Sequence, residues 1–502
     1  MKKLLQGFLR LFDREAPKET PQTTTASIQE ATSSDIASKI TQNVLPQGIR
    51  RRQEKIYLQV GVDFGTSSTK VAYRQLGGRV ELVRPILFQH NLPNYPRYCL
   101  PSLGAFDVSG RLLFGDEAAQ FLLDKDLNNG VKLLKMVLAG RHDPSFYDAA
   151  ADELFHENLK RDFGGNYQPS VEQFVTAFIA FVLRRIRVRL KEHYPNNDLD
   201  VAYNVCIPID YEQNNPVKLI FSRVLRAAEL LESRLDESWS SNILLERAAD
   251  TYDSTGIGTE TIDQRVFLIP ESVGAIASYL TSLRKKSGIH AAYDFGAGTT
   301  DISIFNVFQN AKGGPVAYWY AARNLPQGSE SLERRLCNFV RAQNPPVQLS
   351  ALELSNLVGS LSNQTKNIRE EIHGELTGLW EKSHDTWRAA YGRLRKQGEW
   401  EKEKVQVFVC GGASKLPFIK EIFSQSWMPK WGPYKIADLP GPDIYDNKEG
   451  EAPFERLCVA YGLTTPGPEL GEYRLPRDCP DHTPEKKIRP PVVVYGTTDP
   501  DA

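Results

Sequence analysis

The sequence predicts an α/β fold built from two related halves. Its main support is a repeated pattern: residues 62–72 read VDFGTSSTKVA, and residues 293–303 read YDFGAGTTDIS. Each copy has apolar residues, an aspartate, a tight turn of glycine and hydroxyl residues, and alternating apolar residues, which is typical of a β-hairpin. Further support comes from strand-like apolar runs followed by helical patterns at 267–280 and 405–417. We therefore expect hairpin-bearing sheets with helices packed on them.

The two predicted turns have a composition that suits phosphate binding. Glycine and small hydroxyl residues let backbone N–H groups turn inward, where a branched side chain would block a phosphate oxygen. The expected donors are Gly65, Thr66, Ser67 and Ser68 in the first turn, and Gly296, Ala297, Gly298 and Thr299 in the second.

The copies differ in charge seven residues after the aspartate, where the first has Lys70 and the second has Asp301. The first hairpin can therefore neutralise phosphate, and the second offers an additional carboxylate to a metal ion. If the hairpins face each other across a cleft, Asp63, Asp294 and Asp301 cluster there, and such carboxylates hold a hydrated Mg²⁺.

Composition and competing motifs exclude several other classes of protein. The net charge of −1 gives no global field that would attract nucleic acid, so no nucleic-acid partner is expected. The six cysteines are scattered without paired spacing, which argues for a reducing compartment and against a disulfide scaffold or a zinc site. Neither the P-loop pattern nor a complete dinucleotide fingerprint is present.

Four segments, in order, resemble the actin, sugar-kinase and heat-shock-chaperone ATPase superfamily. They are the two hairpins, the strand and helix at 267–280, and the strand and diglycine at 405–417. The closest resemblance is to the nucleotide-binding domain of the seventy-kilodalton heat-shock chaperones, which the segments at 205–211, 324–328 and 458–462 also resemble. This resemblance covers about residues 54–465. It implies a two-lobed actin-like (ribonuclease H-like) ATPase fold, with ATP or ADP and Mg²⁺ in the cleft between the lobes.

The resemblance also implies a role for individual residues. Asp294 and Asp301 would orient metal and attacking water, Asp63 would support the ion cluster, and Glu271 would position the water. A lysine of the opposite wall is expected at Lys132 or Lys135, with Lys132 favoured. Further nucleotide contacts are expected at Gly328, Gly411, Gly412, Ser414 and Lys415.

Two departures from the chaperone pattern stand out. Lys70 matches the first-loop lysine of actins and sugar kinases, whereas the chaperones lack one there. The adenine-binding helix of the chaperones has no counterpart with matching spacing among Lys366, Arg369 and Glu370. ATP is therefore assumed as the nucleotide by default, because the sequence does not specify the base.

The expected domains are an amphipathic helix (1–15), a disordered linker (16–53), ATPase lobe I (54–286), lobe II (287–440), a return to lobe I (441–465) and a proline-rich irregular tail (466–502). In the first segment, apolar residues at 4, 5, 8, 9, 11 and 12 lie opposite Lys2, Lys3, Arg10 and Arg14. Such a helix can bind an anionic membrane surface or a groove of a partner protein, or have no role. The expected location is the cytoplasm, at the inner face of a membrane.

The first functional expectation is a chaperone-like switch that binds ATP, hydrolyses it slowly and acts on a protein partner. Residues 463–502 are too few for the peptide-binding domain of the full chaperones, so binding of extended peptides is not expected. The alternatives are a membrane-associated, filament-forming bacterial actin relative, a small-molecule kinase, or a pseudo-ATPase that binds without hydrolysis.

Overall fold

The computed structural model describes most of the chain between Lys55 and Cys479. The gaps are 79–80, 93–94, 126–129, 145–151, 154, 157–158, 160–168, 236–239, 257–263, 311–312, 330–364, 395–399, 401–404, 416–417, 448–449 and 451. The predicted amphipathic helix, the linker and the tail from 480 lie outside the described residues. No helix in the described parts has the length and apolar character needed to cross a bilayer.

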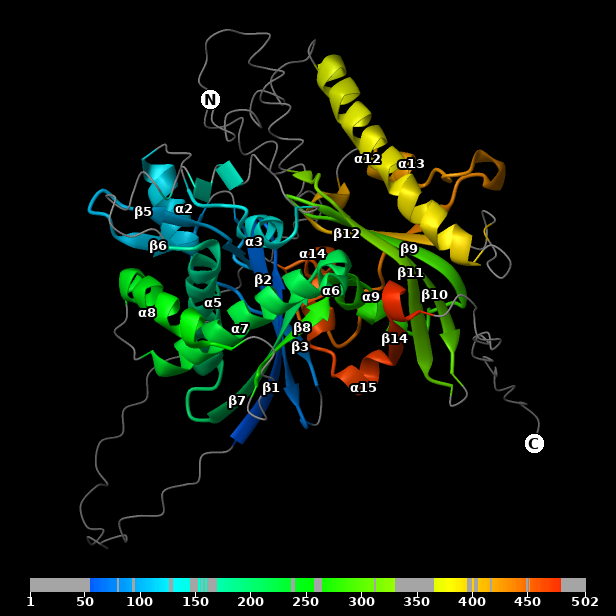
Figure 1. Ribbon diagram of the computed structural model, residues 1–502. Coiled ribbons are helices and arrows are strands. Elements are labelled where there is room, and N and C mark those ends of the chain that lie inside the picture. Colours follow the sequence, from blue (N-terminus) through cyan, green and yellow to red (C-terminus); the bar gives the residue numbers. More distant parts are fainter. Residues whose placement is uncertain are drawn as a thin grey trace, which may run out of the picture.

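Two six-stranded sheets organise the molecule (Figure 1). The first has the order β3 (Val83–Pro85), β2 (Ser68–Leu76), β1 (Lys55–Phe64), β7 (Asp198–Ile207) and β8 (Val266–Pro270), with β4 (Cys99–Pro101) also paired to β2. The second has the order β13 (Lys435–Ala437), β12 (Gln406–Cys410), β9 (Gly288–Phe295), β10 (Thr300–Gln309), β11 (Pro315–Leu325) and β14 (Glu472–Arg474). The α/β class predicted from the sequence is confirmed.

Five strands of each sheet share one topology. The hairpins β1–β2 and β9–β10 are antiparallel, and each continues into a third antiparallel strand, β3 or β11. On its other side each hairpin pairs in parallel with a strand that is followed by a second parallel strand, β7 and β8 or β12 and β13. The repeated sequence pattern therefore reflects a repeat of the strand arrangement, and both predicted hairpins are confirmed.

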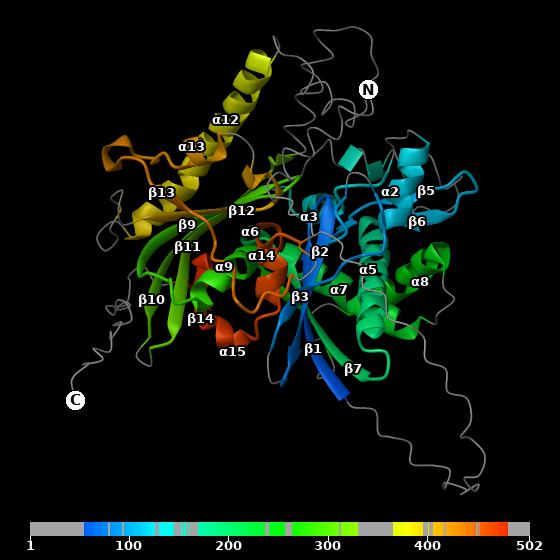
Figure 2. The same cartoon turned by 180° about the vertical axis from the view of Figure 1, so that it is seen from behind.

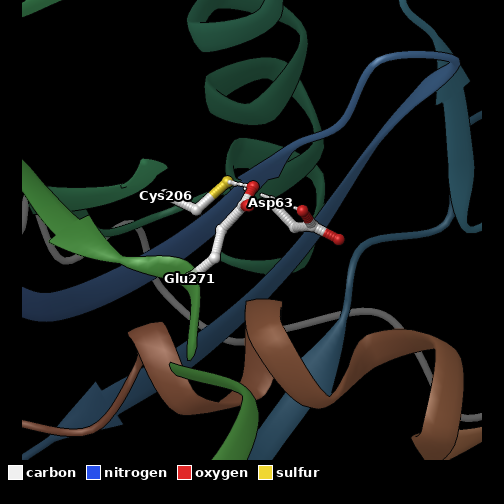
Figure 3. Close-up of side chains that lie close together, drawn as sticks. All are labelled: Asp63, Cys206 and Glu271. Atoms are coloured by element: carbon white, nitrogen blue, oxygen red, sulfur yellow. Dashed lines mark hydrogen bonds between the residues drawn. The ribbon is translucent and has the colours of Figure 1, made fainter. Parts of the chain in front are cut away.

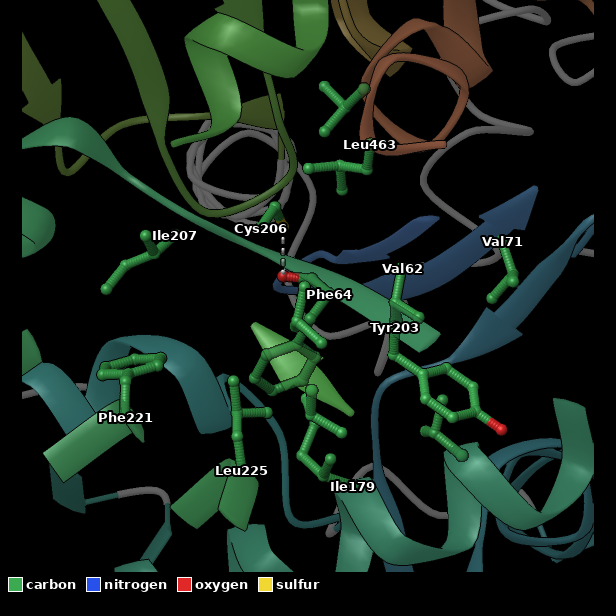
Figure 4. Packing of buried hydrophobic residues seen from close by; sticks show 14 of the residues in the cluster. Val62, Phe64, Val71, Ile179, Tyr203, Cys206, Ile207, Phe221, Leu225 and Leu463 are labelled. Carbon is green, nitrogen blue, oxygen red and sulfur yellow. Dashed lines mark hydrogen bonds between the residues drawn. The ribbon is translucent and has the colours of Figure 1, made fainter. Parts of the chain in front are cut away.

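Helices cover both faces of the first sheet. α5 (Val171–His193), α7 (Asn215–Arg234) and α8 (Ser241–Ser254) pack on one another. Figure 4 shows Ile179, Phe221 and Leu225 from these helices against one side of the β7 region, and Leu463 on the other. The smaller elements beside them are β5 (Gly104–Phe106), β6 (Leu112–Phe114), α2 (Gly115–Asp124), α3 (Leu134–His142) and α6 (Ile209–Gln213).

Two helices lie between the sheets, as both views show (Figures 1 and 2). α9 (Glu271–Thr281) contacts β7, β8 and β9, and α14 (Phe454–Leu463) contacts α9, β1, β2, β7 and β12. The helices meet at Gly274 and Gly462, where a Cβ on Gly462 would lie 1.9 Å from the carbonyl oxygen of Gly274. Only glycine allows the two backbones to come so close.

The second sheet is covered by a long helix and an aromatic cluster. α12 (Thr365–Leu394) packs on β10 and β11, and α13 (Ile419–Phe423) packs on α12. Tyr391, Trp400, Trp427 and Trp431 pack together near the end of α12, mostly edge to face, with ring centroids 5.3–5.8 Å apart. Two short 3-10 helices, η2 (Gly412–Lys415) and η3 (Pro429–Trp431), complete this part.

The described part of the tail is more regular than the sequence predicts. After 466 the chain forms α15 (Gly467–Leu470), β14 and η4 (Pro476–Asp478), and β14 adds a parallel strand beside β11. The expectation of an irregular tail is therefore wrong for these residues. Pro466 precedes α15, and Pro468 and Pro476 lie in the first turns of α15 and η4, where a missing N–H costs nothing. The stretch between them is free of proline and can pair.

Candidate functional site

The turns of the two hairpins lie against each other. In the antiparallel registers Asp63 is opposite Lys70, and Asp294 is opposite Asp301, so both charged pairs stand where the strands end. A Cβ on Gly298 would lie 2.6 Å from Cγ2 of Thr66, which shows how closely the second turn approaches the first. The structure thus brings together the two turns that were predicted, from their composition, to bind phosphate.

Directly beside the turns lies a buried cluster of four polar side chains from four elements. Glu271 begins α9, Cys206 lies on β7 and Asp63 on β1, and Figure 3 shows the three side chains converging. The Sγ of Cys206 donates to Oε1 of Glu271 at 3.1 Å and lies 3.6 Å from Oδ1 of Asp63. Lys135 of α3 donates from Nζ to the same Glu271 oxygen. Burial, together with the charge of Glu271, raises the pKa of the Cys206 thiol, so this group is a neutral donor.

The lysine that reaches Glu271 is Lys135 and not Lys132, which the sequence favoured. Leu133, between them, has a positive φ of 60°, and α3 starts only at Leu134. This turn separates the two side chains: Lys135 is buried against Glu271, whereas the Lys132 side chain passes near Gly130 and is half-buried. Lys135 therefore replaces Lys132 in the site.

In the first hairpin the charges neutralise each other. Nζ of Lys70 lies 2.6 Å from Oδ2 of Asp63, and both side chains are largely buried. Burial alone would lower the pKa of Lys70, but the charge of Asp63 outweighs it and the pKa is raised. Lys70 is therefore a firmly charged ammonium group beside the first hairpin turn.

In the second hairpin the charges repel. Burial raises the pKa of Asp294 to about 7, and the negative charges of Asp63 and Glu271 add to this effect. Burial and the charge of Glu271 also raise the pKa of Asp301 well above its usual value. Among the described residues, the ion pairs of the four carboxylates Asp63, Glu271, Asp294 and Asp301 are those with Lys70 and Lys135, so negative charge is in surplus in this part of the site.

Two residues that the sequence did not assign hold Asp301 in place. Nδ2 of Asn324 donates to both carboxylate oxygens of Asp301, at 3.1 and 3.0 Å. The backbone N–H of Asn324 donates to Oδ2 of Asp210 at 2.6 Å, and Asp210 belongs to α6 in the first half. Burial raises the pKa of Asp210 to about 6. Asn324 is opposite Asp301 on the neighbouring strand β11, and a prediction of this strand pairing would have pointed to Asn324.

The predicted diglycine runs beside Asp294. Gly411 has a positive φ of 85°, and a Cβ there would lie 2.3 Å from Oδ1 of Asp294. At Gly412 the nearest atom to an added Cβ is Nη2 of Arg456, at 3.6 Å. Arg456 of α14 is thus a further cation near the diglycine turn that the sequence analysis did not single out, and its buried Nε has no hydrogen-bond partner among the described residues.

The remaining predicted contacts have structural roles in the described parts. Ser414 donates from Oγ to the carbonyl of Gly411 at 2.9 Å and so fixes the diglycine turn. Gly328 packs on the second hairpin turn, where a Cβ would lie 2.3 Å from the carbonyl oxygen of Ala297. The side chain of Lys415 lies outside the described parts.

The carboxylates are of the kind that a hard divalent cation prefers: Asp63 is buried, Asp294 and Asp301 are half-buried, and negative charge is in surplus there. The oxygens of these three residues do not all lie within 4.8 Å of one another, so a Mg²⁺ ion shared by all three would be held partly through water. Asp63, Cys206 and Glu271 do place three ligand atoms within 4.8 Å of one another, but a neutral thiol suits Mg²⁺ poorly. Comparison with known proteins adds no relative, because no family model matches the sequence and no curated protein is significantly similar to it.

Proposed function

We propose that the chain has a two-lobed actin-like fold, binds Mg·ATP between its halves and hydrolyses it slowly as a conformational switch. One observation carries this proposal. Two hairpins of one topology meet at Thr66 and Gly298, beside a buried or half-buried group of four carboxylates and two lysines. The order of motifs that resembles the chaperone ATPase domain supports the same conclusion.

The two turns would hold the phosphates. The N–H groups of Gly65 and Gly296 donate within the turns, to the carbonyl oxygens of Asp63 and Thr299, so the phosphates would contact the other N–H groups of the two turns. Lys70 and Arg456 would add positive charge at the edges of the cleft. Asp63, Asp294 and Asp301 would hold Mg²⁺, which supplies the positive charge that offsets both the phosphates and the carboxylates. The nucleotide and metal would in this way relieve the repulsion that raises the pKa of Asp294 and Asp301.

Glu271 is the residue that we assign to orient the attacking water. Its Oε1 already accepts from Lys135 and Cys206, so Oε2 is the oxygen that is left for water. Lys135 holds the carboxylate in place, and Asn324 does the same for Asp301. With one oxygen of a fixed carboxylate as the main contact to water, we expect slow turnover, as in nucleotide switches.

Movement of the halves would carry the signal to a partner protein. α9 and α14 join the sheets through a contact of two glycines, so ATP can draw the halves together without repacking large side chains there. We further propose that residues 1–15 bring the protein to an anionic membrane surface, in the cytoplasm.

The test is calorimetric titration of Mg·ATP. We expect binding by the parent protein, a strong loss of affinity without Mg²⁺, and a further loss in the Asp63→Asn/Asp294→Asn variant. The exposed Asp438→Asn variant is the control for loss of a carboxylate. Equal affinity of the parent and the double variant would contradict the site.

A second candidate is a filament-forming actin relative. Lys70 favours it, because the first-loop lysine resembles actins and sugar kinases more than chaperones, and here it is paired with Asp63. Light scattering with Mg·ATP distinguishes the two: growth of scattering with protein concentration supports filaments, and its absence supports the switch.

A further inference from the structure

The short helix α6 of the first half makes hydrogen bonds to the second half near both of its ends. It lies near the middle of the molecule in both views (Figures 1 and 2). Oδ2 of Asp210, in its first turn, accepts from the backbone N–H of Asn324 on β11 at 2.6 Å. Oε1 of Gln213, its last residue, accepts from the backbone N–H of Arg477 in η4 at 3.0 Å. α6 is therefore a bridge between the halves.

The carboxylate of Asp210 contacts an open part of the edge of β11. β14 pairs with β11 at Val316–Tyr318, and in the described parts no strand continues this pairing as far as Asn324. On its other side Asn324 is opposite Asp301 of β10. A backbone N–H at a sheet edge needs an acceptor, and the half-buried Asp210 supplies one from the other half of the molecule. A hydrogen bond to an ionised acceptor is stronger than one between neutral groups.

Asn324 connects this bridge to the nucleotide site. Its backbone N–H donates to Asp210, and its side-chain Nδ2 donates to both carboxylate oxygens of Asp301, at 3.1 and 3.0 Å. The main chain of one residue is thus held from the first half, while its side chain orients a carboxylate of the second half. A change in the separation of the halves acts on the first bond directly and on the second through the position of Asn324.

We propose that Asp210 is a positioning residue, which acts through Asn324 to make the orientation of Asp301, and with it the affinity for Mg²⁺, depend on the separation of the halves. This inference rests on the proposed function, because it takes Asp301 as a carboxylate that holds the metal or its water. When the halves are together, Asp210 holds Asn324, and the carboxylate of Asp301 is fixed. When the halves separate, Asn324 loses its acceptor, and Asp301 loses its fixed orientation.

The coupling acts in both directions. If closed halves raise the affinity for Mg²⁺ by some factor, bound Mg²⁺ favours closed halves by the same factor. Residues that orient a ligating carboxylate by hydrogen bonds typically contribute about 10- to 100-fold to metal affinity. Because Asp210 acts one step further from the metal than Asn324 does, we expect the lower value, about tenfold, for its removal.

Gln213 provides the comparison that separates positioning from simple bridging. It is half-buried and accepts from the other half of the molecule, as Asp210 does. Its partner Arg477 bonds to Gln213, Asn215 and Asp478, and these bonds include none of the site carboxylates. Loss of the Gln213 side chain therefore removes a bond between the halves without a direct path to Asp301.

The first test is hydrogen exchange measured by mass spectrometry without metal or nucleotide. We expect the segment 320–328, which contains the amide of Asn324, to exchange faster in Asp210→Ala than in the parent. Asp210→Asn keeps an acceptor oxygen and should restore most of the protection. Asn324→Ala keeps the backbone N–H and should also stay protected. Thermal unfolding establishes first that each variant is folded.

The second test is calorimetric titration of ATP with and without Mg²⁺. Asp210→Ala should weaken binding of Mg·ATP about tenfold and leave binding of metal-free ATP unchanged, whereas Asp210→Asn should stay within a few-fold of the parent. Gln213→Ala is the matched control, with an expected change in affinity below about twofold. In the Asn324→Ala background, Asp210→Ala should have no further effect, because the connection to Asp301 is already broken.

The outcomes distinguish this proposal from the proposed function. If the parent binds no Mg·ATP, the proposed function fails and the positioning role fails with it, although the exchange experiment still reports on the contact of Asp210 with Asn324. If the parent binds Mg·ATP, only the positioning role is at stake. It is overturned by unchanged exchange or unchanged Mg·ATP affinity in Asp210→Ala, by an equal loss of affinity in Gln213→Ala, or by a full effect of Asp210→Ala in the Asn324→Ala background.

Discussion

The two hairpins of this molecule share a strand arrangement but differ in how they balance charge. In the first, Lys70 and Asp63 lie opposite each other at 2.6 Å and form a neutral pair. In the second, Asp301 occupies the corresponding position opposite Asp294, and no described lysine or arginine forms an ion pair with either acid. The comparison teaches that one fold can supply both a self-contained ion pair and an acidic site that needs a cation from outside.

The largest expected effect is on the free energy of unfolding, when one charge is removed from each hairpin in turn. Lys70→Met leaves Asp63 buried without its partner, and we expect a loss of about 3–5 kcal/mol in the free energy of unfolding. Asp294→Asn removes a repelling charge, so in the absence of metal and nucleotide its stability should equal or exceed that of the parent. Chemical denaturation of both variants measures this difference.

The control for that prediction is an exposed ion pair. Lys420→Met breaks the surface pair of Lys420 with Asp438, and a change below about 1 kcal/mol is expected because both side chains are exposed. A Lys70→Met protein as stable as Lys420→Met would show that the first hairpin is not held by its ion pair.

The next effect concerns turnover. Glu271→Gln keeps the donors Lys135 and Cys206 supplied with an acceptor but weakens the contact to water, so we expect the ATPase rate to fall about 100-fold. ATP affinity should remain within a few-fold of the parent. Single-turnover hydrolysis measures the rate, and an unchanged rate would remove Glu271 from the catalytic role.

A smaller effect is expected from the cation on α14. Arg456 lies near Gly412 with an unused Nε, so Arg456→Gln should weaken Mg·ATP binding by about tenfold if the guanidinium contacts the ligand. Arg477→Gln, at an exposed residue of η4, is the matched control. Calorimetry with both variants decides the matter, and equal affinities would place Arg456 outside the binding site.

The smallest effect is a pH dependence confined to the second hairpin. The pKa of Asp294 is raised from its ordinary 3.8 to about 7 in the folded protein. At pH values between these two, the folded state binds more protons than the unfolded state, so the stabilising contribution is full below pH 3.8 and is lost as the pH rises through 7. Without metal and nucleotide, the melting temperature of the parent should fall more between pH 5 and 8 than that of Asp294→Asn. Parallel profiles would contradict this prediction.

Local patterns predicted the hairpins, and contacts between distant segments account for what the sequence did not predict. Alternating apolar residues around a glycine turn specify a hairpin without reference to the rest of the chain, so the two hairpins that carry Asp63, Lys70, Asp294 and Asp301 were predicted correctly. The choice between Lys132 and Lys135 depends on the backbone of Leu133, which has no sequence signal because leucine rarely takes a positive φ.

The supporting residues of the site were beyond prediction for the same reason. Asp210 and Asn324 lie 114 positions apart and meet only because α6 packs against β11. Cys206 is a buried residue of β7, and the strand order places its thiol against Glu271. Likewise, the proline content of the tail indicated irregular structure, and the partner strand β11 that orders β14 is distant in the sequence.

That tail has a mechanical consequence. Glu469 of α15 forms two hydrogen bonds with Arg74 of β2, at 2.8 and 3.2 Å, and β14 joins the other sheet only three residues later. Residues 469–472 therefore form a short strap across both halves, with Gly471 at a positive φ of 77° as its most adjustable joint. A strap of this length limits how far the halves can separate, and loss of its contact with Arg74 would increase the distance by which they can move apart. Distances measured between spin labels on the two sheets should accordingly spread to larger values in Glu469→Ala than in the parent protein.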